Sequence, residues 1–72
     1  MMKVDGAKIK LIRESQRMTQ ETLAIKAGVT RQAVNSWEKG GVGSFRILNK
    51  IAYLFGVPPE IFLSQDSDPD KE

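Results

Sequence analysis

The stretch that decides the fold is "TQETLAIKAGVTRQAVNSWEKG", residues 19–40. Apolar residues recur at helical spacing on both sides of "KAGVT", but one continuous helix cannot pass through it. Gly28 favours the left-handed conformation that ends a helix, and Thr30 supplies a side-chain oxygen that can cap the next one. Val29 and Val34 flank this cap at the spacing of a hydrophobic staple. The stretch therefore predicts two short helices joined by a sharp turn.

The start of the first of these helices repeats the same device. Met18 and Leu23 flank Thr19 at staple spacing, so this helix is also fixed at its entry. Ala24 and Ala27 are small, as two helix backbones that cross at close range require. We expect the two helices to pack at a steep angle.

The rest of the chain shows helical apolar spacing as well, with no strand-like alternation over any length. The sequence therefore predicts an all-α domain over residues 1–63, with four main helices and a short fifth at "PPEIFL", where Pro59 suits a first helical turn. The breaks between the helices are expected at 17–19, 28–30, 40–44 and 56–59.

Composition excludes most enzyme classes. The chain has 72 residues, 40% of them hydrophobic, which favours one small domain with a modest core. It has no Cys and no His, so thiolate nucleophiles, disulfides, the usual zinc ligand sets and imidazole acid–base chemistry are absent. We expect no catalytic residues, no metal site and no cofactor. Without an apolar signal segment or membrane span, the expected location is the cytoplasm.

The net charge of +2 conceals an uneven distribution. Residues 64–72, "SQDSDPDKE", hold four acidic residues and one lysine, a balance of −3, whereas residues 1–63 hold ten basic and five acidic residues, a balance of +5. A basic body suits a polyanionic partner such as nucleic acid. The acidic, polar end is predicted to be a disordered tail or a linker.

The second helix of the opening stretch has two contrasting faces. At about 100° per residue, five hydrogen-bonding residues fall in an arc of roughly 140°, opposite Ala33, Val34 and Trp37. These five are Arg31, Gln32, Asn35, Ser36 and Lys39. Taken alone, such a face is most often only a solvated surface.

The combination of residues around the turn resembles the lambda-repressor and Cro-like family of DNA-binding proteins, often called the xenobiotic-response-element type. The resemblance rests on apolar, small and glycine residues at the positions of a helix-turn-helix: Leu23, Ala24, Ala27, Gly28, Val29, Val34 and Trp37. It runs from Lys8 to Leu63, through "IKLIRESQRMTQETLA", "GVTRQAVNSWEKG" and "LNKIAYLFGVPPEIFL". The resemblance implies a compact five-helix DNA-binding domain.

The resemblance also implies roles for individual residues, because the third helix of the family lies in the major groove of DNA. The base-reading positions are Arg31, Gln32, Asn35 and Ser36. The phosphate-contacting positions are Thr19, Gln20, Lys39 and Arg46. Capping is the alternative role for Thr19 and Gln20, and plain solvation is the alternative for Lys39 and Arg46.

Three further residue sets have counterparts in the family. Arg13 and Glu38 match two positions that form a buried ion pair between the first helix and the end of the third. Leu11 and Phe62 are expected in the core rather than in a dimer contact. The segment "GGVGS", 40–44, departs from the family, whose members often carry Lys, Arg and Pro there; we expect a flexible loop, with close approach to DNA as the alternative.

The functional hypothesis is a sequence-specific transcriptional regulator that binds double-stranded DNA. We expect a repressor that binds a palindromic operator as a homodimer, on half-sites one helical turn apart, about 34 Å. An antitoxin-like or regulatory protein-interaction module with secondary DNA binding is the alternative. The acidic tail and the missing basic loop leave that alternative open.

Overall fold

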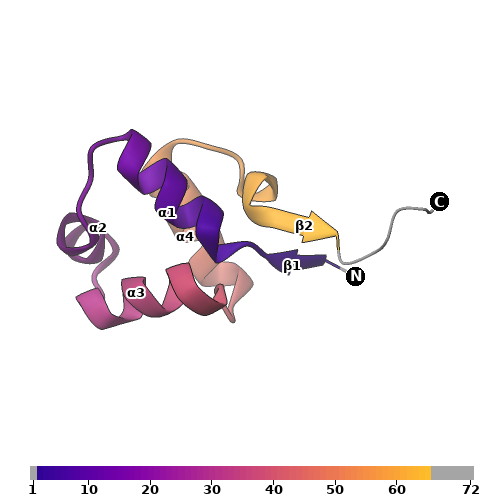
Figure 1. The fold of residues 1–72 in the computed structure, drawn as a ribbon, viewed down its shortest axis with the longest axis horizontal. Coiled ribbons are helices and arrows are strands. Elements are labelled where there is room, and N and C mark those ends of the chain that lie inside the picture. The colour runs from indigo at the N-terminus through magenta and orange to yellow at the C-terminus, as the bar shows by residue number, and fades with distance from the viewer. Residues whose placement is uncertain (1, 66–72) are drawn as a thin grey trace.

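The computed structural model describes residues 2–65, which form four α-helices and a two-stranded sheet that joins the two ends of the folded chain (Figure 1). The elements are β1 (Met2–Val4), α1 (Gly6–Ser15), α2 (Gln20–Ala27), α3 (Arg31–Gly40), α4 (Phe45–Phe55), the 3-10 helix η1 (Pro59–Phe62) and β2 (Leu63–Gln65). None of the helices in this part of the chain combines the length and the apolar run that a membrane span requires.

Each α-helix begins where a side-chain oxygen accepts a hydrogen bond from a backbone N–H of the first turn. The capping residues are Asp5, Thr19, Thr30 and Ser44. Helices α2 and α4 end at glycines with left-handed backbone, Gly28 at φ 72° and Gly56 at φ 73°. Caps and glycines satisfy the free N–H and C=O groups at the helix ends. The four predicted main helices and the breaks between them are confirmed.

Among residues 4–63, the helices enclose one core of eleven buried apolar side chains. These are Ile9, Leu23, Ala24, Ala27, Val34, Trp37, Leu48, Ile51, Ala52, Phe55 and Phe62. The prediction of Phe62 as core is confirmed. The same prediction for Leu11 is wrong, because this side chain is 65% exposed. Leu11 lies between Ile9 and Ile12 in sequence but off the stripe that they form, so the helix turns it toward solvent.

The all-α prediction missed the small sheet. Strands β1 and β2 pair antiparallel, with Met2 opposite Gln65 and Val4 opposite Leu63, and the N–H of Asp5 donates to the carbonyl of Phe62 at 2.6 Å. Strands of three residues are too short to show an alternating pattern, so no sequence signal distinguishes them from loop. Regular structure thus continues to Gln65, beyond the expected domain end at residue 63. Residues 66–72 of the predicted tail lie outside the described part.

The expected fifth helix is a 3-10 turn rather than an α-helix. Pro58 stands at its N-cap without a side-chain hydrogen bond, and the element spans only Pro59–Phe62. An element of four residues that begins with the second of two prolines has too few backbone donors for an α-helix, and the tighter i to i+3 pattern is the usual result.

The start of α1 and the end of α3 approach each other closely through glycine. A Cβ added at Gly6 would collide with the carbonyl oxygen of Trp37 and lie 2.9 Å from that of Glu38. Gly41, with φ 85°, would place a Cβ 2.9 Å from the carbonyl oxygen of Val4. One glycine of the "GGVGS" loop is therefore required by contact with β1, a reason that neither sequence interpretation of the loop contained.

Candidate nucleic-acid interface

Helices α2 and α3 form the predicted helix-turn-helix. Helix α3 has a buried face and, opposite it, a polar face. Val34 is fully buried and Trp37 is 8% exposed on the inner face. Arg31, Gln32 and Ser36 are exposed on the outer face, while Asn35 is half-buried. The staple residues Met18 and Val29 pack against the core at the two helix starts. The predicted base-reading residues thus share one side of α3.

Gln20, in the first turn of α2, is engaged inside the protein. Its side-chain Nε2 donates to Oε1 of Glu38 at 3.0 Å and to Oδ1 of Asn35 at 3.4 Å. The neighbouring carboxylate accepts only, so the amide nitrogen must face Glu38. Both amide protons then have protein acceptors. A phosphate contact from this side chain would require one of these hydrogen bonds to break.

The same contact orients Asn35. Its Oδ1 accepts from Gln20, so its own NH2 group is left for an acceptor outside the fold. Thr19, the preceding residue, caps α2 by accepting from the N–H of Thr22 at 3.0 Å, and its hydroxyl donates to Oγ1 of Thr22 at 2.9 Å. Its side chain is exposed, so capping does not remove it from the surface.

Arg13 and Glu38 form an ion pair that ties α1 to the end of α3. Nε of Arg13 donates to Oε2 of Glu38 at 2.6 Å, and Nη2 donates to Oε1 at 3.3 Å. Nη1 donates to the carbonyl of Met18 at 2.6 Å. The side chains are 8% and 4% exposed, so this charge pair is almost fully removed from water. Glu38 therefore links Arg13 on one side to Gln20 on the other.

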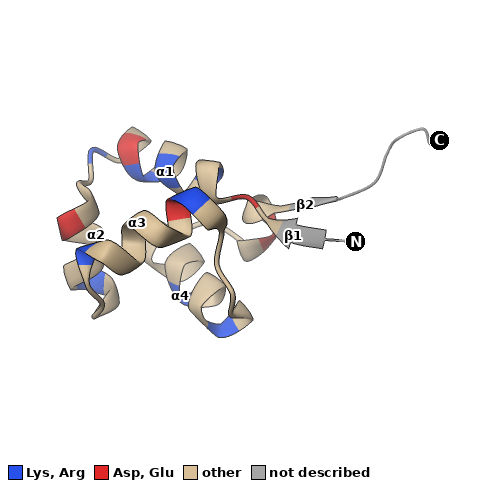
Figure 2. Ribbon diagram, turned by 60° about the horizontal axis from the view of Figure 1, so that its bottom comes forward, with Lys and Arg blue, Asp and Glu red and all other residues tan. Residues whose placement is uncertain are grey.

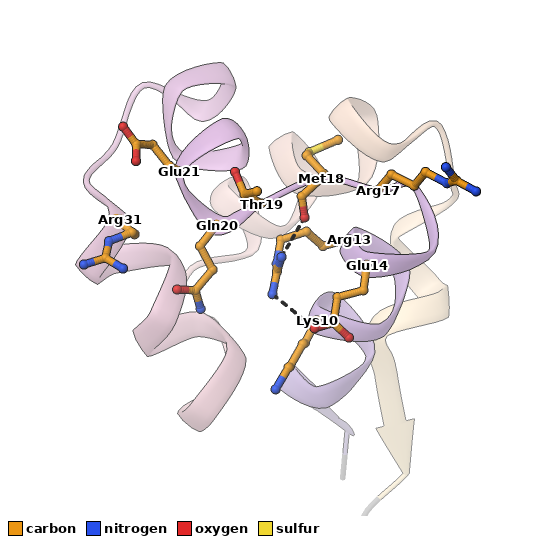
Figure 3. A pocket seen from close by; sticks show the side chains of 9 residues that line it. All are labelled: Lys10, Arg13, Glu14, Arg17, Met18, Thr19, Gln20, Glu21 and Arg31. Carbon is orange, nitrogen blue, oxygen red and sulfur yellow. Dashed lines mark hydrogen bonds and ion pairs between the residues drawn. The ribbon is translucent and has the colours of Figure 1, made fainter.

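A hollow of about 700 Å³ opens beside this network, between α1, the start of α2 and the start of α3 (Figure 3). Figure 3 shows Arg31 on one side of Gln20, with Arg13 and Lys10 on the other. Lys10 and Arg17 also line the hollow, and neither is among the contact residues that the sequence predicts. A sequence signal existed for Lys10, which shares a face of α1 with Arg13 three positions later, but not for Arg17, which lies in the turn after α1.

Arg17 has an unusual backbone. Its φ is 57°, and it is the sole residue other than glycine with positive φ between residues 2 and 65. A left-handed residue that carries a side chain costs of order 1 kcal/mol or more. Its N–H donates to the carbonyl of Glu14 at 2.9 Å, which closes the turn after α1. This turn places an arginine, rather than the favoured glycine, at the edge of the hollow.

The remaining predicted phosphate contacts lie apart from this hollow. Lys39 is exposed in the last turn of α3, and Arg46 is exposed in the first turn of α4. Figure 2 shows basic residues on all four α-helices, whereas the acidic residues of the α-helices lie on α1, α2 and α3 and none lies on α4. No group of three or more His, Cys, Asp or Glu within residues 2–65 could hold a metal ion.

Comparison with protein families adds an independent finding. The family described as Helix-turn-helix matches residues 9–62, which include all four α-helices in part or in full and η1. An HTH-type transcriptional regulator of Methanocaldococcus jannaschii, MJ0272, is 43% identical over 63 residues. The match covers 85% of this chain and 96% of that protein.

Two solved structures show the same arrangement of helices. The restriction-modification controller protein C.AhdI of Aeromonas hydrophila superposes with a TM-score of 0.70 at 28% identity, over 76% of this chain and 85% of that one. SinR, a master regulator for biofilm formation, was solved in complex with DNA; it superposes with a TM-score of 0.71 at 27% identity, over 79% of this chain and 94% of that one.

Proposed function

We propose that this chain, which belongs to the lambda-repressor and Cro-like helix-turn-helix family, is a cytoplasmic repressor that binds a specific DNA sequence. Members of this family are DNA-binding transcriptional regulators and not enzymes. The protein binds a short palindromic operator as a homodimer and places α3 in the major groove. The observation that carries this proposal is the outer face of α3, where exposed hydrogen-bonding side chains stand on a helix whose inner face is locked into the core.

Base reading is assigned to four residues on this face. Arg31, in the first turn of α3, can donate two hydrogen bonds to O6 and N7 of a guanine, and Gln32 can pair with N6 and N7 of an adenine. Asn35 presents its NH2 group to a base acceptor, because Gln20 holds its oxygen. Ser36 is short and reaches a base edge only where the helix lies deep in the groove.

Phosphate contacts are assigned to both sides of α3. Thr19 and the free N–H groups at the start of α2 face one strand, because helix N-termini favour anions. Lys10 and Arg17 extend this contact along the hollow. On the far side, Lys39 and Arg46 supply charge near the end of α3. These contacts fix the position of the domain without reading sequence.

Dimerisation follows from the small number of base contacts that one domain offers. Two copies on half-sites about 34 Å apart double these contacts and add their binding free energies on one face of the DNA. The expected operator is therefore an inverted repeat. This geometry also predicts that DNA stabilises the dimer, because both domains are held by one duplex.

Selection of bound sequences from a random DNA pool tests the proposal. We expect enrichment of an inverted repeat with a centre-to-centre spacing near one helical turn, 10–10.5 base pairs. A single unrepeated motif would contradict the dimer. Failure to enrich any motif would refute sequence-specific binding and favour the protein-interaction module instead.

One arginine variant and one lysine variant then distinguish base reading from general attraction to DNA. Arg31→Ala should lose roughly 1–3 kcal/mol of binding free energy on the selected operator and little on scrambled duplex. Lys39→Ala should weaken both duplexes about equally and lower the salt slope by about one unit. Lys26→Ala, a matched loss of one exposed cation on α2, serves as the control. If Arg31→Ala loses the same binding free energy on both duplexes, Arg31 does not read a base.

A further inference from the structure

A second, smaller hollow lies behind the recognition helix, between the turn of the helix-turn-helix and α4. We propose that this hollow binds a small aromatic carboxylate of a single ring, with the ring against apolar side chains and the carboxylate between Arg46 and Lys50. This inference goes beyond the proposed DNA binding and does not depend on it, because it concerns the free protein.

The floor of the hollow is apolar and comes from three elements. Ala27 and Val29 line it from the turn, Trp37 from the inner face of α3, and Ile47 from α4. Ala27 and Trp37 belong to the core, and Val29 and Ile47 pack against it, so these walls have fixed positions. A flat apolar group would therefore enter a preformed site without a large ordering cost.

The polar side of the hollow carries two cations and no anion. Arg46 and Lys50 both line it, one helical turn apart on α4, and none of its lining residues is acidic. Nζ of Lys50 donates to the carbonyl of Ala27 at 3.1 Å, which uses one of its three protons. Neither cation has a carboxylate partner within residues 2–65. A ligand carboxylate can thus accept from both side chains.

The size of the hollow limits the ligand. Its volume is about 220 Å³, whereas pockets for drug-sized ligands span about 300–1,000 Å³. One aromatic ring with a carboxylate is the class that meets the volume, the apolar floor and the paired cations together. A neutral ring would form no ion pair with Arg46 or Lys50, and a small aliphatic acid would not cover the apolar floor.

The chain contains one tryptophan, and it lines this hollow, so binding can be followed directly. Intrinsic tryptophan fluorescence is recorded while the full chain is titrated with benzoate at constant ionic strength and neutral pH. Benzyl alcohol supplies the ring without the charge, and acetate supplies the charge without the ring. We expect saturable change with benzoate, with a midpoint in the millimolar range, and at least tenfold weaker response to the other two compounds.

Charge variants locate the site. Arg46→Met and Lys50→Met should each weaken benzoate binding about tenfold, because each removes one charge-assisted hydrogen bond. Lys8→Met removes one exposed cation from α1, outside the hollow, and should bind benzoate as the parent does. Arg46→Met leaves intact the hydrogen bond from Lys50 to the carbonyl of Ala27, so this variant remains informative if Lys50→Met proves unstable. Amide NMR spectra should show benzoate shifting the Gly28 N–H and the Trp37 indole N–H.

Three results would overturn the proposal. One is a linear, non-saturating fluorescence response to benzoate. The second is equal binding of benzoate, acetate and benzyl alcohol. The third is a loss of benzoate affinity in Lys8→Met that matches the loss in Arg46→Met, since this would show general attraction of anions to a basic protein.

Discussion

Breaking the ion pair between Arg13 and Glu38 should remove a large part of the stability of this domain. The Glu38 side chain is 4% exposed in the parent; in Arg13→Met it keeps Gln20 as a side-chain donor but loses its counter-ion and two hydrogen bonds. Loss of one partner of a buried pair typically costs about 3–5 kcal/mol. We expect about 3 kcal/mol, the lower end, because the hydrogen bond from Gln20 remains.

This cost is large for a small domain. Stabilities of roughly 0.05–0.15 kcal/mol per residue give about 4–11 kcal/mol for a chain of this length. At about 4–8 °C per kcal/mol, a loss of 3 kcal/mol lowers the melting temperature by about 12–24 °C. The melting temperature of Glu38→Gln should also fall clearly, because the buried Arg13 guanidinium then keeps the Met18 carbonyl, a neutral amide and the exposed Glu14 carboxylate 3.8 Å away, but no buried counter-ion.

Thermal melts and urea titrations of the single and double variants test this reasoning. Replacing both members in Arg13→Met/Glu38→Gln should cost less than the sum of the two single changes, because no charge is then left buried alone. Glu14→Gln is the matched control; Glu14 lies 3.8 Å from Arg13 but is 56% exposed, so its stability should stay within about 0.5 kcal/mol of the parent. Melting temperatures of Arg13→Met that equal those of the control would refute the claim that burial makes this pair important.

Three other changes probe different parts of the molecule. Gly6→Ala should lower the free energy of unfolding measured in urea titrations by about 1–3 kcal/mol, because its Cβ meets the backbone of α3. Gly43→Ala has open space around its Cβ and should not lower it. Equal stabilities of the two variants would show that α1 can shift at no cost. Removal of residues 66–72, which carry a net charge of −3, should strengthen non-specific duplex binding, most at low salt, and an unchanged affinity in filter-binding titrations would contradict this. Gln20→Ala and Asn35→Ala should be non-additive in operator binding measured by fluorescence anisotropy, because the first acts through the second; strictly additive losses would mean that Gln20 contacts DNA independently.

The central part of the fold could be predicted from local sequence, because local interactions produce it. Thr30 caps α3, Gly28 ends α2, and Val29 and Val34 fix the angle at which the chain enters α3. These contacts join residues only a few positions apart, so the residue types themselves specify the geometry. The small sheet escaped prediction for the opposite reason: β1 and β2 pair residues from the two ends of the folded chain, and neither strand has a sequence pattern of its own.

The candidate site divides in the same way. The sequence by itself determined the polar face of α3, because a helix of fixed period places Arg31 and Gln32 opposite Val34 whatever lies around it. Only the tertiary structure decided what Gln20 does: Glu38, eighteen residues away, needs hydrogen-bond donors in a place that water barely reaches, and Gln20 supplies one. It likewise decided that Gly6 must lack a side chain, because the crossing of α1 and α3 brings two backbones together there. Helix period and caps are properties of neighbouring residues, whereas burial and close approach arise only when distant segments meet.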